Sequence, residues 1–249
     1  MLLFLLPPSN QVCFAAEPVS EQSEQFFDLP LNGTINLENT DGTINVVGWY
    51  VPRVRLAAVR KAYTPERLQQ IRVETTSHAD SLLVRTVIPQ ISGLFADRSG
   101  TVDYTVTAPE TSHLVLKLTN GEITLQGLRA GAARLELING RITAIDCFAQ
   151  VEARATNGVI EVVFEWWENH PANFNLFLRQ GPIMARVPAD SPLRVEAQTN
   201  HGWIHNSLGL AQATNQRHGQ SLKAAKGPGS LLSLGLRTGK GNISLDAVR

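Results

Sequence analysis

A short motif, Asn-Gly-x-Ile or a close variant, recurs along this 249-residue chain and constrains its fold more than any other feature. The glycines of the copies are Gly42, Gly121, Gly140, Gly158, Gly181, Gly202 and Gly241, and isoleucine stands two positions after each. Asn-Gly and Asp-Gly supply the positive φ that tight turns need. The sequence therefore predicts a series of equivalent turn-and-strand units.

The residues around each turn alternate between apolar and polar. In the copy at Gly121, Leu114 and Leu116 precede the turn, Ile123 and Leu125 follow it, and the positions between them are largely polar. Alternation with period two is typical of a strand that buries one face. Each unit is thus expected to bury one face on both sides of its turn.

The spacing of the copies favours stacking of these units. The glycines from Gly121 to Gly140 and on to Gly158 lie 19 and 18 residues apart. A stacked repeat keeps the character of each position. We therefore predict an all-β solenoid, a β-helix-like roll of repeats of about 18–21 residues. The alternative is a sandwich or blade array built from hairpins with Asn-Gly turns.

The predicted repeat domain spans residues 26–249 and follows a linker at 17–25. A strand-rich insertion at about 50–110 interrupts it after the first copy, with strands near 54–60, 71–75, 81–88 and 101–107. Thr64 and Pro65 predict the start of one short helix. Residues 207–230, rich in Gln, Gly, Lys and Ala, are expected to form a flexible loop.

The first residues resemble an export signal. Residues 1–6 are apolar (MLLFLL), and a small-residue stretch ends at Ala15 and Ala16, so we predict a signal peptide over 1–16. The alternative is a disordered tail. No later stretch reaches the roughly 20 apolar residues of a membrane span.

Composition excludes several classes of function. Lys plus Arg and Asp plus Glu both number 22, a balance that is not typical of nucleic-acid binders. Dinucleotide-binding and Walker motifs are absent, and no cofactor is expected. Cys147 is the only cysteine beyond the predicted signal and is interpreted as a small buried hydrophobe.

No catalytic or metal site is predicted. His201 and His205 are the only close histidines, and they straddle a turn rather than share a helix face. Glycoside chemistry on a β-helix would need a convergent carboxylate pair. Glu161 and Glu165 point the same way and Asp146 lies nearby in the chain, but a solvated charged face is the favoured interpretation.

Aromatic residues are the candidates for binding. Trp203 occupies an outward position that is polar in most copies, and His205 lies two positions further on. An exposed aromatic ring on a polar sheet face can pack on a sugar or a protein partner. Trp166 and Trp167 are further candidates, although one of them could instead cover an end or loop of the stack.

The order of these parts resembles a family of bacterial putative adhesins, which are β-strand-repeat domains of cell-envelope proteins. Residues 33–49 (GTINLENTDGTINVVGW), residues 102–109 (VDYTVTAP) and the Asn-Gly-x-Ile copies carry the resemblance. The degenerate copy at Gly181 and the wide gap before Gly241 depart from it.

The resemblance implies a right-handed β-helix-like fold outside the cytoplasm and no enzyme activity. We therefore predict an exported, non-enzymatic module of the periplasm or cell surface that binds an envelope glycan or a surface protein through its outward strand face. The alternatives are a polysaccharide lyase or hydrolase, and a structural spacer or envelope-stress accessory protein.

Overall fold

The structure is a computed structural model that describes residues 17–93, 97–227, 229 and 231–248. The predicted signal peptide at 1–16 lies outside these residues. The strands are β1 (Val19–Asp28), β2 (Thr34–Trp49), β3 (Arg53–Ala62), β4 (Arg72–Ser77), β5 (Ser81–Val87), β6 (Thr101–Pro109), β7 (His113–Gln126), β8 (Arg129–Ile145), β9 (Phe148–Val163), β10 (Ala172–Gln180), β11 (Ile183–Pro188), β12 (Leu193–His201), β13 (Ile204–Asn206), β14 (Thr214–Gln216), β15 (Gly219–Lys226), β16 (Leu232–Lys240) and β17 (Ile243–Val248). One helix, α1 (Pro65–Gln70), lies among the described residues.

Copies of the motif that neighbour one another in space pair parallel and in register. Between β7 and β8, Gly121 pairs with Gly140 and Ile123 with Ile142, and the same register continues from β8 to β9. In a hairpin, by contrast, the two strands that flank one turn would pair antiparallel with each other. Equivalent positions of neighbouring copies therefore lie side by side.

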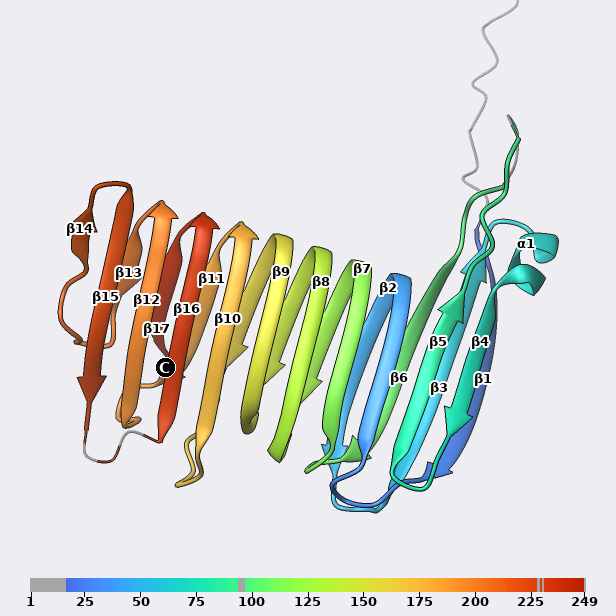
Figure 1. Cartoon of the computed structure of the whole chain (residues 1–249), viewed down its shortest axis with the longest axis horizontal. Coiled ribbons are helices and arrows are strands. Elements are labelled where there is room, and N and C mark those ends of the chain that lie inside the picture. Colours follow the sequence, from blue (N-terminus) through green and yellow to red (C-terminus); the bar gives the residue numbers. More distant parts are fainter. Residues whose placement is uncertain (1–16, 94–96, 228, 230, 249) are drawn as a thin grey trace, which may run out of the picture.

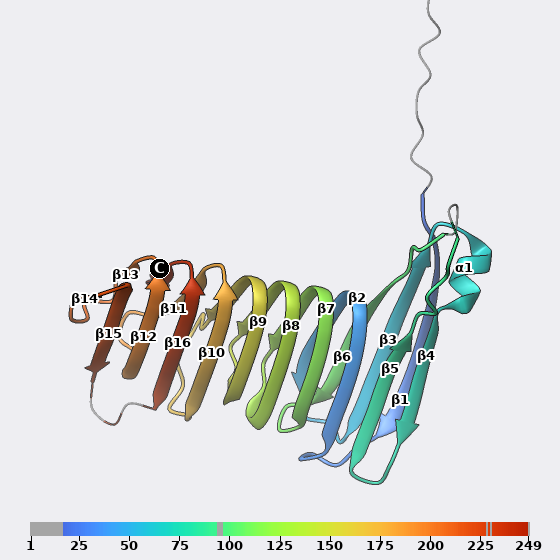
Figure 2. The ribbon, with the colours of Figure 1, turned by 45° about the horizontal axis from the view of Figure 1, so that its top comes forward.

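Strands β2, β7, β8 and β9 each run through their turn, and their two halves belong to different layers. In the later copies the halves are separate strands: β10 with β11, β12 with β13, and β16 with β17. The front layer, as we call it, contains the first halves of the long strands together with β10, β12 and β16. The rear layer contains their second halves together with β11, β13 and β17. Together they form a mixed sheet of 17 strands within the described residues, and this sheet does not close on itself (Figures 1 and 2).

The order of the copies in space differs from their order in the chain. Strand β16 pairs with both β10 and β12, so the last copy, at Gly241, lies between the copies at Gly181 and Gly202. At the other end, β2 lies between β7 and the pair β5 and β6. Near each end of the stack, a strand is thus inserted between neighbours that are remote from it in sequence.

Two expectations about the ends are wrong. Residues 17–25 are not a linker, because most of them belong to β1, which pairs antiparallel with β3. Residues 207–230 are not only a loop, because β15 pairs antiparallel with β12 and with β14. Both segments extend the layers at opposite ends of the stack (Figure 1).

The insertion contains the expected elements. Strands β3 to β6 agree with the predicted ranges, and β5 and β6 continue the front and rear layers beside β2. The hydroxyl of Thr64 accepts a hydrogen bond from the Arg67 amide at 3.2 Å, and Pro65 is the first residue of α1. The N-cap prediction is therefore confirmed.

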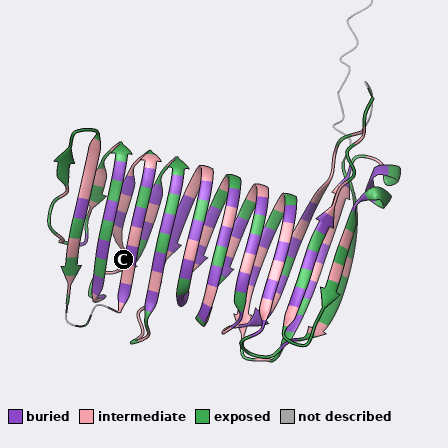
Figure 3. Ribbon diagram, viewed as in Figure 1, coloured by how far each residue is buried: buried purple, intermediate pink, exposed green. Residues whose placement is uncertain are grey.

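Inward side chains of the two layers form the core. Buried and exposed residues alternate along the strands (Figure 3). Leu116, Leu135, Ala153 and Leu176, which pair in register across four strands, are all at most 3% exposed. Full burial of each large apolar side chain contributes roughly 1.5–3 kcal/mol.

The turn glycines stack directly on one another. A Cβ atom on Gly140 would lie 1.8 Å from the carbonyl oxygen of Gly121, and one on Gly158 would lie 1.7 Å from that of Gly140. Their φ angles of 135° also lie in a region that favours glycine. Glycine is therefore required here both by conformation and by the close approach of the next turn.

Candidate functional site

Trp203 lies on the outer surface of the rear layer, directly after the turn at Gly202. The residue is 64% exposed. The backbone is fixed on both sides, because the Trp203 amide donates to Oδ1 of Asn242 at 3.2 Å and the Ile204 amide donates to Oε1 of Gln220 at 2.7 Å. The indole is thus presented to solvent by a well-held backbone.

His205 lies on the same side of β13 as Trp203. Its Nε2 atom is 3.8 Å from Oδ1 of Asp246, and its side chain is 64% exposed. The ring of His201 stacks instead on that of His218, with centroids 6.4 Å apart. The described residues contain no group of three or more side chains that could hold a metal ion.

Trp166 and Trp167 lie at a different edge of the stack from Trp203. They follow the end of β9, whereas Trp203 follows a turn glycine. Their ring centroids are 5.1 and 5.9 Å from that of Phe148, which is fully buried. The structure therefore does not bring them together with Trp203.

Arg129 holds the segment that carries these two tryptophans. Its guanidinium lies 5.5 Å from the ring centroid of Trp166, and its Nη1 atom donates to both carboxylate oxygens of Glu168 at 2.6 and 2.7 Å. The contacts of Trp166 are those of a side chain that covers an edge of the core.

Two of the carboxylates considered for catalysis, Glu161 and Asp146, are used in structural contacts. Glu161, only 12% exposed in its side chain, forms ion pairs with Arg186 and, at 3.2 Å, with Arg141. Oδ1 of Asp146 accepts a hydrogen bond from the Glu165 amide at 2.8 Å. These contacts do not create a pair of free carboxylates facing one groove.

The environment of Cys147 makes its thiol a poor nucleophile. It is 1% exposed, and its thiol donates to the Ile145 carbonyl at 3.3 Å. Burial raises the pKa of the Cys147 thiol to about 11. At neutral pH the thiolate needed for nucleophilic attack is therefore scarcely populated.

A groove in the front layer escaped the sequence-based prediction. It encloses ≈ 480 Å³ and crosses strands β7 to β10. Ile138 and Phe177, respectively 48% and 46% exposed, lie in it beside Lys117, Arg154 and Arg179. We call it the front groove. An aromatic residue at a position that is charged or polar in the other copies was the available signal.

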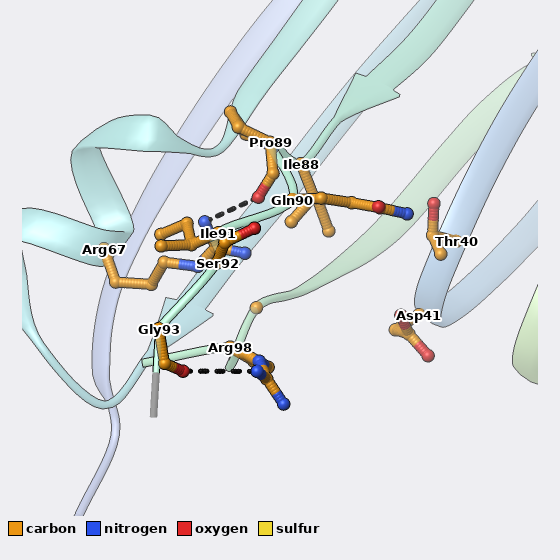
Figure 4. A pocket seen from close by; sticks show the side chains of 11 residues that line it. Thr40, Asp41, Arg67, Ile88, Pro89, Gln90, Ile91, Ser92, Gly93 and Arg98 are labelled. Carbon is orange, nitrogen blue, oxygen red and sulfur yellow. Dashed lines mark hydrogen bonds between the residues drawn. The ribbon is translucent and has the colours of Figure 1, made fainter. Parts of the chain in front are cut away.

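A second, more polar hollow lies between the turn of β2 and the segment around residues 88–100 (Figure 4). Arg67 lies at its wall and is 4% exposed. Its guanidinium donates to the carbonyls of Ser99 at 2.7 Å and Pro89 at 2.9 Å, which fixes both ends of that segment. Its Nε and Nη1 atoms are therefore used in contacts within the chain.

Comparison with known proteins yields structural likeness only. No family model and no curated protein matches the sequence. A putative cell adhesion protein from Clostridium sporogenes matches with a TM-score of 0.50 and 12% identity, over 93% of this chain and 100% of the other. A putative adhesin from Bacteroides fragilis (TM-score 0.26, 10% identity) and a putative lipid binding protein from Parabacteroides distasonis (TM-score 0.33, 10% identity) match over 92% of this chain and 97% of theirs.

The first of these likenesses shows a shared fold. Its name agrees with the bacterial putative-adhesin family that the sequence resembles. Among the described residues, no helix is long and apolar enough to cross a membrane.

Proposed function

We propose that this chain is a non-enzymatic binding module, exported to the periplasm or cell surface, that binds an envelope glycan or a surface protein. The observation that carries the proposal is the 64% exposure of Trp203 on a polar sheet face. Large exposed aromatic rings are enriched at the centres of binding interfaces. His205, on the same side of the strand, provides a polar neighbour for a partner.

Three further observations support the proposal. Residues 1–6 are apolar and small residues follow at 13–16, as in an export signal. The fold is shared with a solved structure named as a putative cell adhesion protein. The in-register parallel copies are what a β-solenoid would contain, and we propose that the whole stack is a right-handed roll of this kind.

Neither alternative is favoured by a specific contact. The carboxylate of Glu161 is ion-paired with two arginines and therefore is not available as one member of a catalytic pair with Glu165. A spacer without a ligand gives no role to the exposed indole of Trp203. The packing of Trp166 and Trp167 against Phe148 is compatible with a spacer and with a binding module alike.

The test is a binding assay with the full chain. Envelope fractions and a glycan array are probed with the wild type, with Trp203→Ala and with Tyr50→Ala, a matched control because Tyr50 is 84% exposed at another site. Every bound glycan is also assayed for cleavage. Thermal unfolding verifies that each variant retains its fold.

We expect binding without cleavage, weakened about 30-fold or more by Trp203→Ala and unchanged by Tyr50→Ala, since truncation of a central aromatic contact costs about 2 kcal/mol or more. Cleavage of a bound glycan would establish the enzyme alternative. Absence of binding to every fraction would favour the structural spacer.

A further inference from the structure

Two rows of outward side chains form the walls of the front groove. Lys117, Glu136, Arg154 and Phe177 pair in register across β7, β8, β9 and β10 and form the first wall. The second wall consists of the residues two positions further along each strand: Thr119, Ile138, Thr156 and Arg179. Since neighbouring strands lie ~4.8 Å apart, the groove runs about 14 Å across the strands.

The floor of the groove offers no free backbone groups. Leu118, Leu137, Ala155 and Leu178, which lie between the two walls, pair in register across the four strands, so that the main chain at these positions is used in the sheet. An extended peptide generally binds a sheet through unpaired main-chain groups at an edge. A ligand of this groove must therefore be recognised by side chains.

The lining of the groove is mainly cationic. Three cations, Lys117, Arg154 and Arg179, line the groove together with one carboxylate, that of Glu136. Lys117 and Arg154 have exposed ion-pair partners outside the lining, Glu38 at 3.2 Å and Glu152 at 2.8 Å. Exposed pairs of this kind contribute little and can exchange for a ligand.

Arg179 is the cation best placed for a ligand. It lies between the register pairs Leu178–Thr238 and Gln180–Lys240, so its neighbour on β16 is Gly239, which has no side chain. The guanidinium is exposed at one end of the groove and can bind a carboxylate or sulfate through two parallel hydrogen bonds.

Phe177 extends the groove toward the next strand. With Arg154 it also lines a hollow of ≈ 220 Å³ over Gly235, where the outward row lacks a side chain. Arg154 and Arg237 flank Phe177 in register on its two sides. The aromatic ring is thus accessible between two cations.

We infer that the front groove binds an acidic oligosaccharide. The apolar face of a sugar ring can pack on Phe177, the threonine hydroxyls can bond to sugar hydroxyls, and Arg154 and Arg179 can bind acidic groups. This inference rests on the proposed binding function and gives it a ligand class and a second surface, in the layer opposite to that of Trp203.

The inference is tested by titrating the full chain with four probes: tetragalacturonate, a sulfated tetrasaccharide, neutral maltotetraose and hexaglutamate. The variants are Phe177→Ala and Arg179→Gln. Their matched controls are Phe26→Ala, since Phe26 is 55% exposed on β1, and Arg217→Gln, an exposed arginine before β15. All four positions are solvent-accessible, and thermal unfolding verifies the fold.

We expect at least one acidic tetrasaccharide to bind and maltotetraose to bind far more weakly. Added salt should weaken the binding of the acidic tetrasaccharide. Phe177→Ala and Arg179→Gln should each reduce that affinity about tenfold, whereas the controls leave it unchanged. Equal binding of hexaglutamate would overturn the inference, because charge alone would then suffice.

The outcomes also separate this inference from the proposed function. Envelope binding that depends on Trp203 but is unaffected by Phe177→Ala and Arg179→Gln, with no affinity for either acidic tetrasaccharide, would refute the groove alone. If the chain binds none of the four probes and no envelope fraction, both proposals fail.

Discussion

Asn139 donates a hydrogen bond from its side-chain nitrogen to the side-chain oxygen of Asn120, 2.9 Å away in the neighbouring strand. Asn157 donates in the same way to Asn139 at 2.9 Å, and Asn120 donates to Asp41 at 2.8 Å. Each central amide both donates and accepts, and such chains of hydrogen bonds strengthen one another. Asparagine before the glycine thus serves the stacking as well as the turn.

Replacement of Asn139 by alanine should interrupt this ladder in its middle. Two hydrogen bonds are lost, and since the ladder is partly exposed we expect the free energy of unfolding to fall by about 1–2 kcal/mol. Urea denaturation measures it. Asn169→Ala, at an exposed position outside the strands, is the control. An unchanged urea midpoint in Asn139→Ala would show that the ladder contributes nothing.

Replacement of Gly140 by alanine should be far more damaging. The new Cβ atom would meet the Gly121 carbonyl at 1.8 Å, and backbone must move to relieve the clash. We expect a loss of more than about 3 kcal/mol or failure to fold. Gly209→Ala is the matched control, because Gly209 also has a positive φ (68°) but has nothing within 4 Å of a Cβ.

For Gly209→Ala we expect a loss of only about 1 kcal/mol, the cost of the left-handed conformation. Thermal and urea unfolding of the two variants compare a crowded turn glycine at φ 135° with an uncrowded glycine at φ 68°. Similar losses of unfolding free energy in Gly140→Ala and Gly209→Ala would contradict the close packing of the turns.

The stacking was predictable because it depends on local, repeated chemistry. The Asn-Gly turns, the apolar alternation and the capped helix at Thr64 are properties of short segments, and the structure contains each of them. The order of the copies was not predictable. It depends on which open strand edge each segment meets, as when β16 pairs between β10 and β12.

Edge strands were missed for a related reason. β1 has the polar sequence VSEQSEQFFD and is exposed on both faces, so it lacks the alternation of a half-buried strand. Its pairing with β3 includes ion pairs such as Arg60 with Glu21 at 2.7 Å. The front groove was missed because the residues of its walls meet across strands, not along one.

Cys147 should make stability fall at alkaline pH. Burial raises the pKa of its thiol to about 11, above the value of about 9 in an unfolded chain. Below pH 9 both states are protonated. Between pH 9 and 11 mainly the unfolded state loses the proton, so the free energy of unfolding falls as the pH rises, by about 3 kcal/mol in total.

Urea denaturation of the wild type and of Cys147→Ala from pH 8 to 11 isolates this contribution. The buried hydroxyl of Tyr104, whose pKa is raised from 10 to about 12, is present in both chains and therefore cancels in the difference between them. We expect the two stability curves to converge as the pH rises. Parallel curves would show that the thiol ionises equally in both states.

Arg129 should determine whether the edge segment after β9 stays closed. Its guanidinium joins Glu168 at 2.6 Å and Glu110 at 3.4 Å, and lies over the rings of Phe148 and Trp166. Arg129→Ala removes all of these contacts at once. Because the side chain is 36% exposed, we expect a moderate loss of about 1–2 kcal/mol.

The local effect of Arg129→Ala should exceed the global one. Residues 164–171 carry two tryptophans over the buried ring of Phe148, and without the arginine they should open more often than the strands unfold. Hydrogen exchange and limited proteolysis at these residues measure this opening, with Arg217→Ala as the exposed control. Faster exchange confined to this segment would establish Arg129 as its clamp. If exchange rises equally throughout the chain, the arginine instead stabilises the stack as a whole.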